Sequence, residues 1–421
     1  MALTEVSGED VLRSIELFKT LGRDEFLDRH GLRKSRYFLL EHEGVLCDAE
    51  AILSVAHLIC EGKPSSLPRG EAAAALRLRT LGFEVLDVRD PSDGEIVQSA
   101  LDKKVSPGAI KTRAEVSDIY GGGSQSGILP SASSPTVLIY SDPHVGEALG
   151  YVDGWVPDDE HGPLFEYTGH GRGNQTLDGD GNRAIFDHAS QGRALRLFKA
   201  VGTVPNSSTM RHRYVGRFKL DIERPIEVRW RPNEKGIERR VIVFRLRPSG
   251  PHEKLVDDYI PPSPETQAIL IPAETTTSSL VDPEKNKKKG GSRSAIPQTE
   301  FQRREAKLET QFRQFMKDWG RELKRFEIKI KGLASPVITD VYDPTEHVLY
   351  ELKGNSERNA VRMAIGQLMD YRRHITPPNP ALAVLLPEEP NEDLKALLDT
   401  LGIALVYREG AVFVGVPGLR S

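Results

Sequence analysis

Apolar and polar residues follow two different periods along the chain, and each change of period marks a change of structure. Near the N-terminus Val11, Ile15 and Phe18 keep the spacing of a helix, which is expected to end at Gly22. The pattern then predicts a hairpin over 36–46, helices over 49–60 and 71–81, and a strand over 83–88. Residues 1–105 are therefore expected to form a small α+β head.

The middle of the chain follows a period of two, which is typical of half-buried strands. A segment rich in Gly, Ser and Pro, 106–134, comes first and is expected to be a loop or linker. Alternation is clearest from Arg193 to Leu197. Strands are expected at 136–140, 164–168, 194–201, 214–220, 226–230 and 240–246, with a helix at 182–191. Residues 106–262 are therefore expected to form a β-rich domain.

The last third of the chain is separated from the middle by a Pro-, Ser- and Thr-rich stretch that ends in three lysines and two glycines. We expect this stretch, residues 263–297, to be a flexible linker. Helices are then expected at 300–319, 357–374 and 391–400, and strands at 325–330, 336–342, 348–352, 382–386, 403–407 and 411–416. Apolar strands that alternate with helices predict an α/β domain over 298–421 with a central mixed sheet.

The composition sets limits on the class of protein. With 421 residues, 38% hydrophobic and 28% charged, the chain is typical of a globular protein, and it has no apolar run of membrane-spanning length. No signal peptide is recognisable, and two cysteines are too few for a disulfide framework or a Cys-rich zinc site, so we expect a cytoplasmic protein.

The charge of the chain is unevenly distributed. The net charge of −4 opposes binding to nucleic acid, but residues 193–247 contain 15 Lys and Arg against 5 Asp and Glu. This basic stripe could contact phosphates, or it could be the solvated surface of a sheet.

A candidate catalytic group follows from strand alternation near residue 350. Asp340 is expected to end one apolar strand, and the chain returns through a turn into the next strand. Glu351 and Lys353 then point to one side of the sheet, while Tyr350 and Leu352 point to the other. Two carboxylates that converge at the end of a sheet are suited to Mg²⁺, which can activate a water molecule and stabilise charge on a phosphate.

Two helices add polar residues to this group. The apolar stripe of helix 300–319 consists of Phe301, Leu308, Phe312, Phe315 and Trp319. Glu305 falls on this stripe, where a carboxylate is costly unless it is paired or bound to metal, whereas Glu309 lies off it and is expected to be solvated. Helix 357–374 carries Gln367 and Tyr371 on one face.

Asp340, the Glu351-Leu-Lys353 tripeptide and the helix with Gln367 and Tyr371 together resemble the PD-(D/E)XK nuclease superfamily. The resemblance implies that Asp340 and Glu351 bind Mg²⁺, with Mn²⁺ as an alternative, and that no zinc is used. It also implies that Lys353 is catalytic, that Glu305 supports the metal, and that Gln367 and Tyr371 line the site or the DNA path. The alternative is a chance pattern on a solvated strand edge.

Aromatic residues among glycines form a second candidate site in the middle of the chain. A pocket for a base flipped out of a duplex needs flat aromatic walls and a few hydrogen-bonding groups. The candidates are Tyr151, Asp153, Trp155, Tyr167 and Thr168. The alternative is that Tyr151, Trp155 and Tyr167 are core aromatics of a β-barrel.

These motifs resemble the SRA (YDG) domain, a β-barrel-like (PUA-like) reader of 5-methylcytosine and 5-hydroxymethylcytosine. The resemblance implies that Tyr151 and Tyr167 sandwich the flipped base. Asp153, or Asp158 in its place, would accept from the cytosine amino group, assisted by Thr168. The arginines expected to contact DNA phosphates are Arg172, Arg211, Arg213 and Arg217.

As a whole, the chain resembles the ScoMcrA-like modification-dependent (type IV) restriction endonucleases. Segments 23–31, 56–57 and 81–85 are similar to the N-terminal head of that family. The chain departs from the family in having no His-Asn-His zinc nuclease, in Cys47-Asp48-Ala49-Glu50, and in Asn174. Cys47–Glu50 stands where Tyr-Asp-Ser-Lys is common, so this loop lacks the lysine, and Asn174 stands where Asp is frequent.

The resemblance implies a multidomain α+β protein of the bacterial cytoplasm that binds double-stranded DNA carrying modified cytosine and cleaves it with Mg²⁺. Cleavage of both strands would require a homodimer or two visits. A non-cleaving reader and a nuclease indifferent to modification are the alternatives.

Overall fold

The computed structural model describes residues 6–62, 70–123, 125–178, 181–273 and 300–419. The chain divides into two compact units. The first contains residues from 1–145, 178–220 and 247–254, and the second contains residues from 146–177, 221–246 and 255–421. Residues of the expected middle domain therefore occur in both units, and each unit is described by itself.

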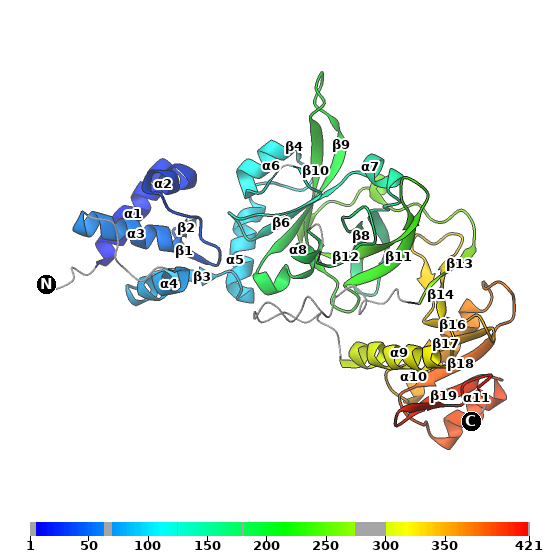
Figure 1. Cartoon of the computed structure of the whole chain (residues 1–421). Coiled ribbons are helices and arrows are strands. Elements are labelled where there is room, and N and C mark those ends of the chain that lie inside the picture. The colour runs from blue at the N-terminus through cyan, green and yellow to red at the C-terminus, as the bar shows by residue number, and fades with distance from the viewer. Residues whose placement is uncertain (1–5, 63–69, 124, 179–180, 274–299, 420–421) are drawn as a thin grey trace. The chain divides into compact units, whose positions relative to one another are not determined.

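The head of the first unit is the predicted α+β structure (Figure 1). Its elements are α1 (Gly8–Leu21), α2 (Arg23–His30), β1 (Phe38–His42), β2 (Val45–Asp48), α3 (Ala49–Glu61), α4 (Glu71–Thr80) and β3 (Glu84–Asp87). The strands form one antiparallel sheet in the order β2-β1-β3. Val11, Ile15 and Phe18 are buried in the head core, which confirms the predicted face of α1. The predicted hairpin is also present, with Glu43 and Gly44 at positive φ in its turn.

Three helices of the first unit were not expected. Helix α2 buries only Phe26 and Leu27, so its sequence carries little periodicity. Helix α5 (Pro91–Asp102) begins with Pro, and the side chain of Asp90 caps it. Helix α6 (Arg113–Tyr120) lies in the segment predicted as a loop or linker, and that prediction is wrong there because Thr112 and Glu115 form a capping box that starts the helix.

The remaining strands of the first unit form a sheet built on β9 and β10. The elements are β4 (Ile110–Thr112), β5 (Ile128–Pro130), β6 (Thr136–Ser141), α7 (Pro143–Ala148, which crosses into the second unit), α8 (Asn182–Phe186), the 3₁₀ turn η1 (Ala189–Gln191), β9 (Ala194–Thr203) and β10 (Met210–Leu220). Strand β6 is parallel to β9, and the pairs β5–β6, β9–β10 and β4–β10 are antiparallel.

The second unit begins with a set of antiparallel strands. Its elements are β7 (Gly154–Asp159), β8 (Gly162–Thr168), β11 (Ile226–Pro232), β12 (Glu238–His252, of which residues from 247 on belong to the first unit) and the 3₁₀ turn η2 (Val256–Asp258). Strand β12 pairs with β8 and β11, and β7 pairs with β8. In the part of the chain that the structure describes, no series of strands closes on itself, so the expected β-barrel is wrong.

The C-terminal region of the second unit is the predicted mixed sheet with helices. It comprises β13 (Gln267–Pro272), α9 (Glu300–Asp318), β14 (Lys324–Lys329), β15 (Val337–Ile338), β16 (Val341–Asp343), β17 (Val348–Leu352), α10 (Arg358–Tyr371), β18 (Ala381–Leu386), α11 (Glu392–Thr400), β19 (Ala404–Glu409) and β20 (Val412–Val414). The strand order is β13-β14-β16-β17-β18-β19-β20, with β15 beside β14. Strands β17, β18 and β19 are parallel, and the other pairs are antiparallel.

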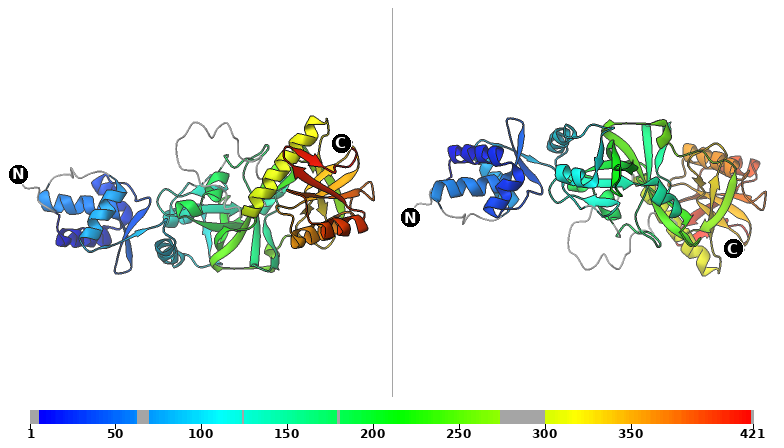
Figure 2. Two further views of the ribbon diagram at one scale, coloured as in Figure 1. Left: turned by 90° about the horizontal axis from the view of Figure 1, so that it is seen from below. Right: turned by 90° about the horizontal axis from the view of Figure 1, so that it is seen from above.

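Helices cover both faces of this sheet (Figure 2). Strand alternation in β17 explains why: Tyr350 packs with Phe312 of α9 on one face. Leu349 packs with Leu368 of α10 and Leu398 of α11 on the other face. Residues of β17 therefore alternate between two apolar cores. A charged side chain on this strand is buried on either face, so it needs a hydrogen-bonding or ionic partner at the end of the sheet.

Three expectations for this region are wrong. Strand β13 lies inside the predicted linker and pairs with β14, while residues 274–299 lie outside the described part of the chain. The strand expected at 336–342 is interrupted at Thr339 and Asp340, where the buried Thr339 hydroxyl accepts from Phe326 N. Trp319 lies beyond the end of α9 and is 55% exposed, so it is not part of the apolar stripe. The side chain of Phe301 is outside the described residues.

The described helices include none with the length and apolar character needed to cross a bilayer.

Acidification is expected to destabilise the first unit through His188. Burial lowers the pKa of His188 to about 4, against 6.5 for a free histidine, and its Nδ1 lies 2.8 Å from Ile185 O, which it meets as a donor. Because the unfolded chain binds the proton more tightly, stability is lost as the pH falls from 6.5 towards 4. Calorimetric unfolding at pH 7 and pH 5 is expected to differ by about 2 kcal/mol on account of this group. His188→Gln should remove that part of the difference, and an unchanged pH dependence in the variant would contradict the assignment.

Candidate active site

Asp340 lies in the interruption between β15 and β16, at the end of the neighbouring strand β17. Its Oδ2 accepts a hydrogen bond from Leu352 N at 2.7 Å. This bond attaches the carboxylate to the backbone between Glu351 and Lys353. The break in the predicted strand therefore places Asp340 beside the two residues that the sequence pairs with it.

Glu351 and Lys353 lie on the same side of β17, as alternation predicts. Lys353 Nζ donates to Glu351 Oε1 at 2.7 Å, and the two side chains are 7% and 3% exposed. Lys353 N donates to Leu385 O, which continues the pairing with β18 past the end of β17. The backbone of Lys353 is therefore fixed by β18, and its ammonium group is fixed by Glu351.

Helices α9 and α10 supply the other candidate residues. Glu305 Oε1 accepts from Gly354 N at 3.2 Å, and Gln367 Nε2 donates to Tyr371 Oη at 3.3 Å. Glu305, Asp340, Gln367 and Tyr371 line one cavity of about 620 Å³ within the second unit. Four residues selected from the sequence thus line a common space.

Glu351 and Lys353 are not among the residues that line this cavity, but they adjoin Asp340, and negative charge accumulates around this point. Burial raises the pKa of Glu305 to about 7, and the charge of Asp340 adds to the effect. Burial also raises the pKa of Glu351 well above its ordinary value, again with a contribution from Asp340. Burial alone would lower the pKa of Lys353, but the carboxylates of Glu351 and Asp340 outweigh it and raise the pKa. The positive charge of Lys353 is therefore the counterpart of three carboxyl groups, those of Glu351, Asp340 and Glu305.

This donor set fits a hard divalent cation. The charge of Asp340 helps to raise the pKa values of Glu305 and Glu351, so a cation between these groups would relieve a cost already present. Within the described residues, no group of three or more His, Cys, Asp or Glu side chains forms a ready metal cage. Mg²⁺ does not need one, because it keeps several waters and commonly takes one or two carboxylates together with phosphate oxygens.

Glu309 is not solvated, contrary to expectation. It is 8% exposed and forms an ion pair with Arg325 of β14, and both residues line the cavity. Helix periodicity could not show this pair, because the partner comes from a strand 16 residues further along the chain. Burial raises the pKa of Glu309, with Arg325 opposing the rise.

The expected base-pocket residues lie on the loop before β7, on β7 and on β8 in the second unit. Tyr151 Oη donates to Gly171 O at 2.8 Å, and Asp153 Oδ1 accepts from Thr168 N at 2.7 Å. Thr168 Oγ1 accepts from Val152 N at 3.3 Å. The structure therefore brings Asp153 and Thr168 together, while the hydroxyl of Tyr151 bonds to the loop that contains Gly171. Trp155 is fully buried against Phe165, and Tyr167 is also buried.

Two residues that sequence reasoning missed hold this segment. Gln175 Nε2 donates to Gly169 O at 2.6 Å and lies 3.2 Å from Tyr151 Oη. Arg239 donates to Leu149 O and Gly171 O, and its guanidinium lies 5.2 Å from the centre of the Tyr151 ring. In the sequence, only the glycine-rich composition of 169–175 indicated that the backbone of this loop needs hydrogen bonds from other side chains.

Comparison with known families identifies two segments of the chain. The family model described as "ScoMcrA-like, N-terminal head domain" matches residues 4–87, and that described as "ScoMcrA-like, SRA domain" matches residues 107–257. The chain contains a ScoMcrA-like head domain and a ScoMcrA-like SRA domain. The base-pocket candidates all lie in the matched SRA domain, whereas the cavity with Asp340 is lined mainly by the C-terminal region that neither model covers.

Solved structures also resemble the chain, at low scores. The type IV phosphorothioation-dependent restriction endonuclease ScoMcrA is 16% identical, with 61% of this chain and 70% of that chain covered and a TM-score of 0.27. The sulfur-binding and SRA domains of ScoMcrA complexed with phosphorothioated DNA are 21% identical, covering 58% and 78%, with a TM-score of 0.29. The DNA modification-dependent restriction endonuclease AspBHI is 11% identical, covering 69% and 84%, with a TM-score of 0.24. No curated protein matches the sequence.

Many arginines of the SRA domain are internal. Arg213 is paired with Glu253, and Arg217 is paired with Glu95 and Asp102. Of the four arginines expected to contact phosphates, Arg172 is exposed and Arg211 is half-buried. Arg213 and Arg217 therefore fit neither interpretation of the basic stripe, phosphate contact or a solvated sheet surface. Their charges pair with carboxylates inside the fold.

Contacts within the second unit join the SRA domain to the sheet that carries Asp340. Ser335 Oγ, in the loop before β15, donates to Glu166 Oε1 at 2.8 Å. Arg231 of β11 forms an ion pair with Glu327 of β14 at 2.5 Å. Strand β11 and the turn before it also line the cavity with Asp340. These pairs are more than 90 residues apart in the chain, so no sequence pattern could show them.

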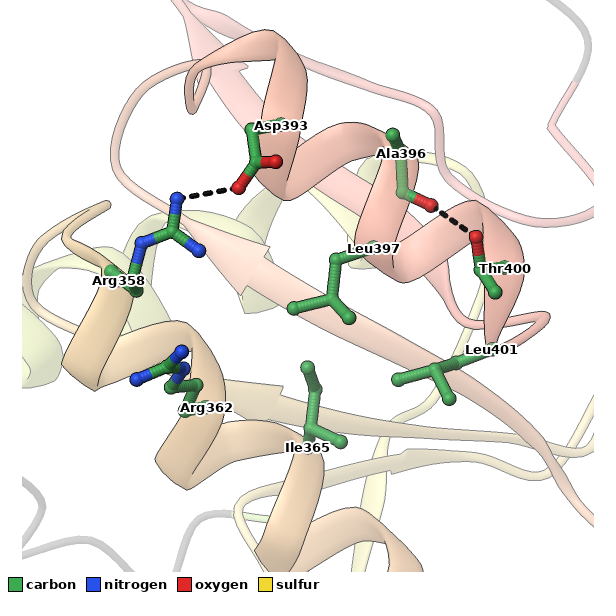
Figure 3. A pocket seen from close by; sticks show the side chains of 8 residues that line it. All are labelled: Arg358, Arg362, Ile365, Asp393, Ala396, Leu397, Thr400 and Leu401. Atoms are coloured by element: carbon green, nitrogen blue, oxygen red, sulfur yellow. Dashed lines mark hydrogen bonds and ion pairs between the residues drawn. The ribbon is translucent and has the colours of Figure 1, made fainter.

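A second hollow, of about 550 Å³, lies between α10 and α11 (Figure 3). Its polar residues include Arg362 and the ion pair of Arg358 with Asp393, and Ile365, Leu397 and Leu401 extend into it. None of the predicted catalytic residues lines it.

Replacing Arg325 with Met is expected to destabilise the second unit by about 3 kcal/mol, because the buried Glu309 then keeps only its longer ion pair, with Arg313 at 3.9 Å. Calorimetric unfolding of the full chain measures the loss. The double variant Glu309→Gln, Arg325→Met should recover most of it, since no buried charge remains. Equal stabilities of the single and double variants would show that the pair does not carry the cost.

Proposed function

We propose that this protein is a modification-dependent endonuclease. Its SRA domain binds DNA that carries modified cytosine, and its C-terminal region, of the PD-(D/E)XK type, hydrolyses phosphodiester bonds with Mg²⁺. The observation that carries the proposal is the convergence of Asp340, Glu351 and Lys353 at the end of β17. The family match of the head and SRA domains supports the choice of modified DNA as the substrate.

Asp340 and Glu351 would hold the Mg²⁺, with Mn²⁺ as an alternative, and Glu305 would support them. When bound, the cation supplies positive charge for the phosphate and lowers the pKa of a coordinated water. The residues of the chain then have separate tasks. Lys353 places an ammonium group beside the carboxylates, where it can neutralise charge that develops on the phosphate. Glu305, whose pKa is about 7, can hold or release a proton near neutral pH.

The SRA domain would read the DNA by flipping a modified cytosine out of the duplex. Tyr151 would supply an aromatic face, and Asp153, which is bonded to Thr168, follows it two residues later in the chain. The substrate class is double-stranded DNA with 5-methylcytosine or 5-hydroxymethylcytosine. Because each chain has one proposed hydrolytic site, cutting both strands requires a homodimer or two successive visits.

Lys353→Ala is expected to reduce nicking of a methylated plasmid in the presence of Mg²⁺ by about a hundredfold or more, because one preorganised charge at the phosphate is lost. Gel analysis of supercoiled and nicked plasmid measures the rate. Lys331→Ala, which removes an exposed lysine of the same region, is the control and should nick normally.

Binding of a methylated duplex without metal shows whether the Lys353 variant is folded and retains its reader. Lost nicking with retained binding supports the site. Unchanged nicking by the Lys353 variant rejects the site assignment. Binding without any nicking by the natural protein would make it a non-cleaving reader.

Tyr151 is expected to determine the preference for modified DNA. Tyr151→Ala should reduce the ratio of cleavage rates on methylated and unmethylated copies of one plasmid by about tenfold, the scale of a lost base–aromatic stack. Tyr151→Phe keeps the ring and should retain most of the preference. Equal rates on both plasmids with the natural protein would remove the reader from the proposal, and a panel of plasmids with different cytosine modifications then identifies the preferred one.

A further inference from the structure

A basic hollow of about 260 Å³ adjoins the candidate active site on helix α9. It is lined by Arg304, Lys307, Gln311, Gly354, Asn355 and Arg408, among other residues. Three of these side chains are cationic, and Glu388 is the only carboxylate in the lining. In the part of the chain that the structure describes, neither Lys307 nor Arg408 takes part in a side-chain ion pair. Among the described residues, Lys307 and Arg408 thus bring two positive charges to the hollow without an ion-pair partner.

Helix geometry places this hollow next to the catalytic cavity. Lys307 and Gln311 are four residues apart and share one face of α9. Glu305 and Glu309 are also four residues apart and line the catalytic cavity from another face. The two spaces meet at Gly354, which lines the hollow, directly follows Lys353 and donates to Glu305 Oε1 at 3.2 Å.

The two spaces have opposite charge. The catalytic side contains the carboxyl groups of Glu305, Asp340 and Glu351. Burial and the charge of Asp340 raise the pKa values of Glu305 and Glu351. The other side presents Lys307 and Arg408 together with the amide side chains of Gln311 and Asn355. A ligand that occupies both must carry several anionic groups in a row and accept a cation at one of them.

We propose that the basic hollow binds the phosphodiester backbone of the DNA next to the phosphate that is hydrolysed. The proposal rests on the proposed function, which puts the scissile phosphate at Asp340 and Glu351. Lys307 and Arg408 donate to phosphate oxygens, and the contact is independent of base sequence, because backbone contacts position a duplex without reading it. The hollow therefore orients the strand along α9 while the SRA domain selects the site.

The test measures how the affinity of the full-length protein for a methylated duplex depends on salt concentration, without metal. Each lost phosphate contact is expected to lower the slope of log K against log salt by about 1, so the double variant Lys307→Ala, Arg408→Ala should lose about 2 and bind about tenfold more weakly. Lys307→Arg with Arg408→Lys keeps both charges and should retain the natural slope. Lys317→Ala, in the last turn of the same helix, is the control for a lysine outside the hollow.

The duplex is compared with inorganic phosphate at constant ionic strength, which separates backbone binding from capture of a free anion. Weak competition by phosphate supports the backbone as ligand, and displacement of the duplex at low phosphate concentration would overturn it. A natural slope in the double variant would overturn the proposal even if the protein cleaves normally. Binding without cleavage by the natural protein would contradict the proposed function instead, and failure to bind DNA would overturn both.

Discussion

Three carboxyl groups and one ammonium group share a small, largely buried space at the end of β17, and the proposed chemistry depends on that imbalance. The bond from Leu352 N to Asp340 keeps one carboxylate in place, and the bond from Gly354 N to Glu305 keeps another. Both donors are backbone groups, so the fold itself holds the charges together. Their repulsion is a cost that a bound cation and a phosphate would convert into binding energy.

Strand periodicity was sufficient to place Glu351 and Lys353 on one side, because the period of two leaves little freedom once β17 is buried on both faces. The position of Glu305 on the α9 stripe was also informative, since a carboxylate there needs a partner. The fate of Glu309 was not predictable, because Arg325 comes from another element and only the folded sheet brings it close. Asp340 was placed correctly beside Glu351, but the strand break that holds it depends on Thr339, whose contact is tertiary.

The arginines of the SRA domain show the limit of composition as evidence. Arg196 is fully buried and donates to Tyr214 Oη and pairs with Asp102, so its charge serves the interior of the first unit. A count of basic residues cannot distinguish such a side chain from one that faces a phosphate. The smaller group around Lys307 and Arg408 has less charge in total, but the structure leaves that charge at a surface hollow beside the catalytic cavity.

Strand β13 has a consequence for where the C-terminal region can be separated from the rest. Its six residues complete one edge of the sheet and cover β14, yet they precede the segment 274–299 in sequence. A fragment that starts at residue 298 would expose the paired edge of β14 along its length, and exposed edges invite pairing with other chains. A separable C-terminal fragment should therefore begin before Gln267, so that the region carries its first strand with it.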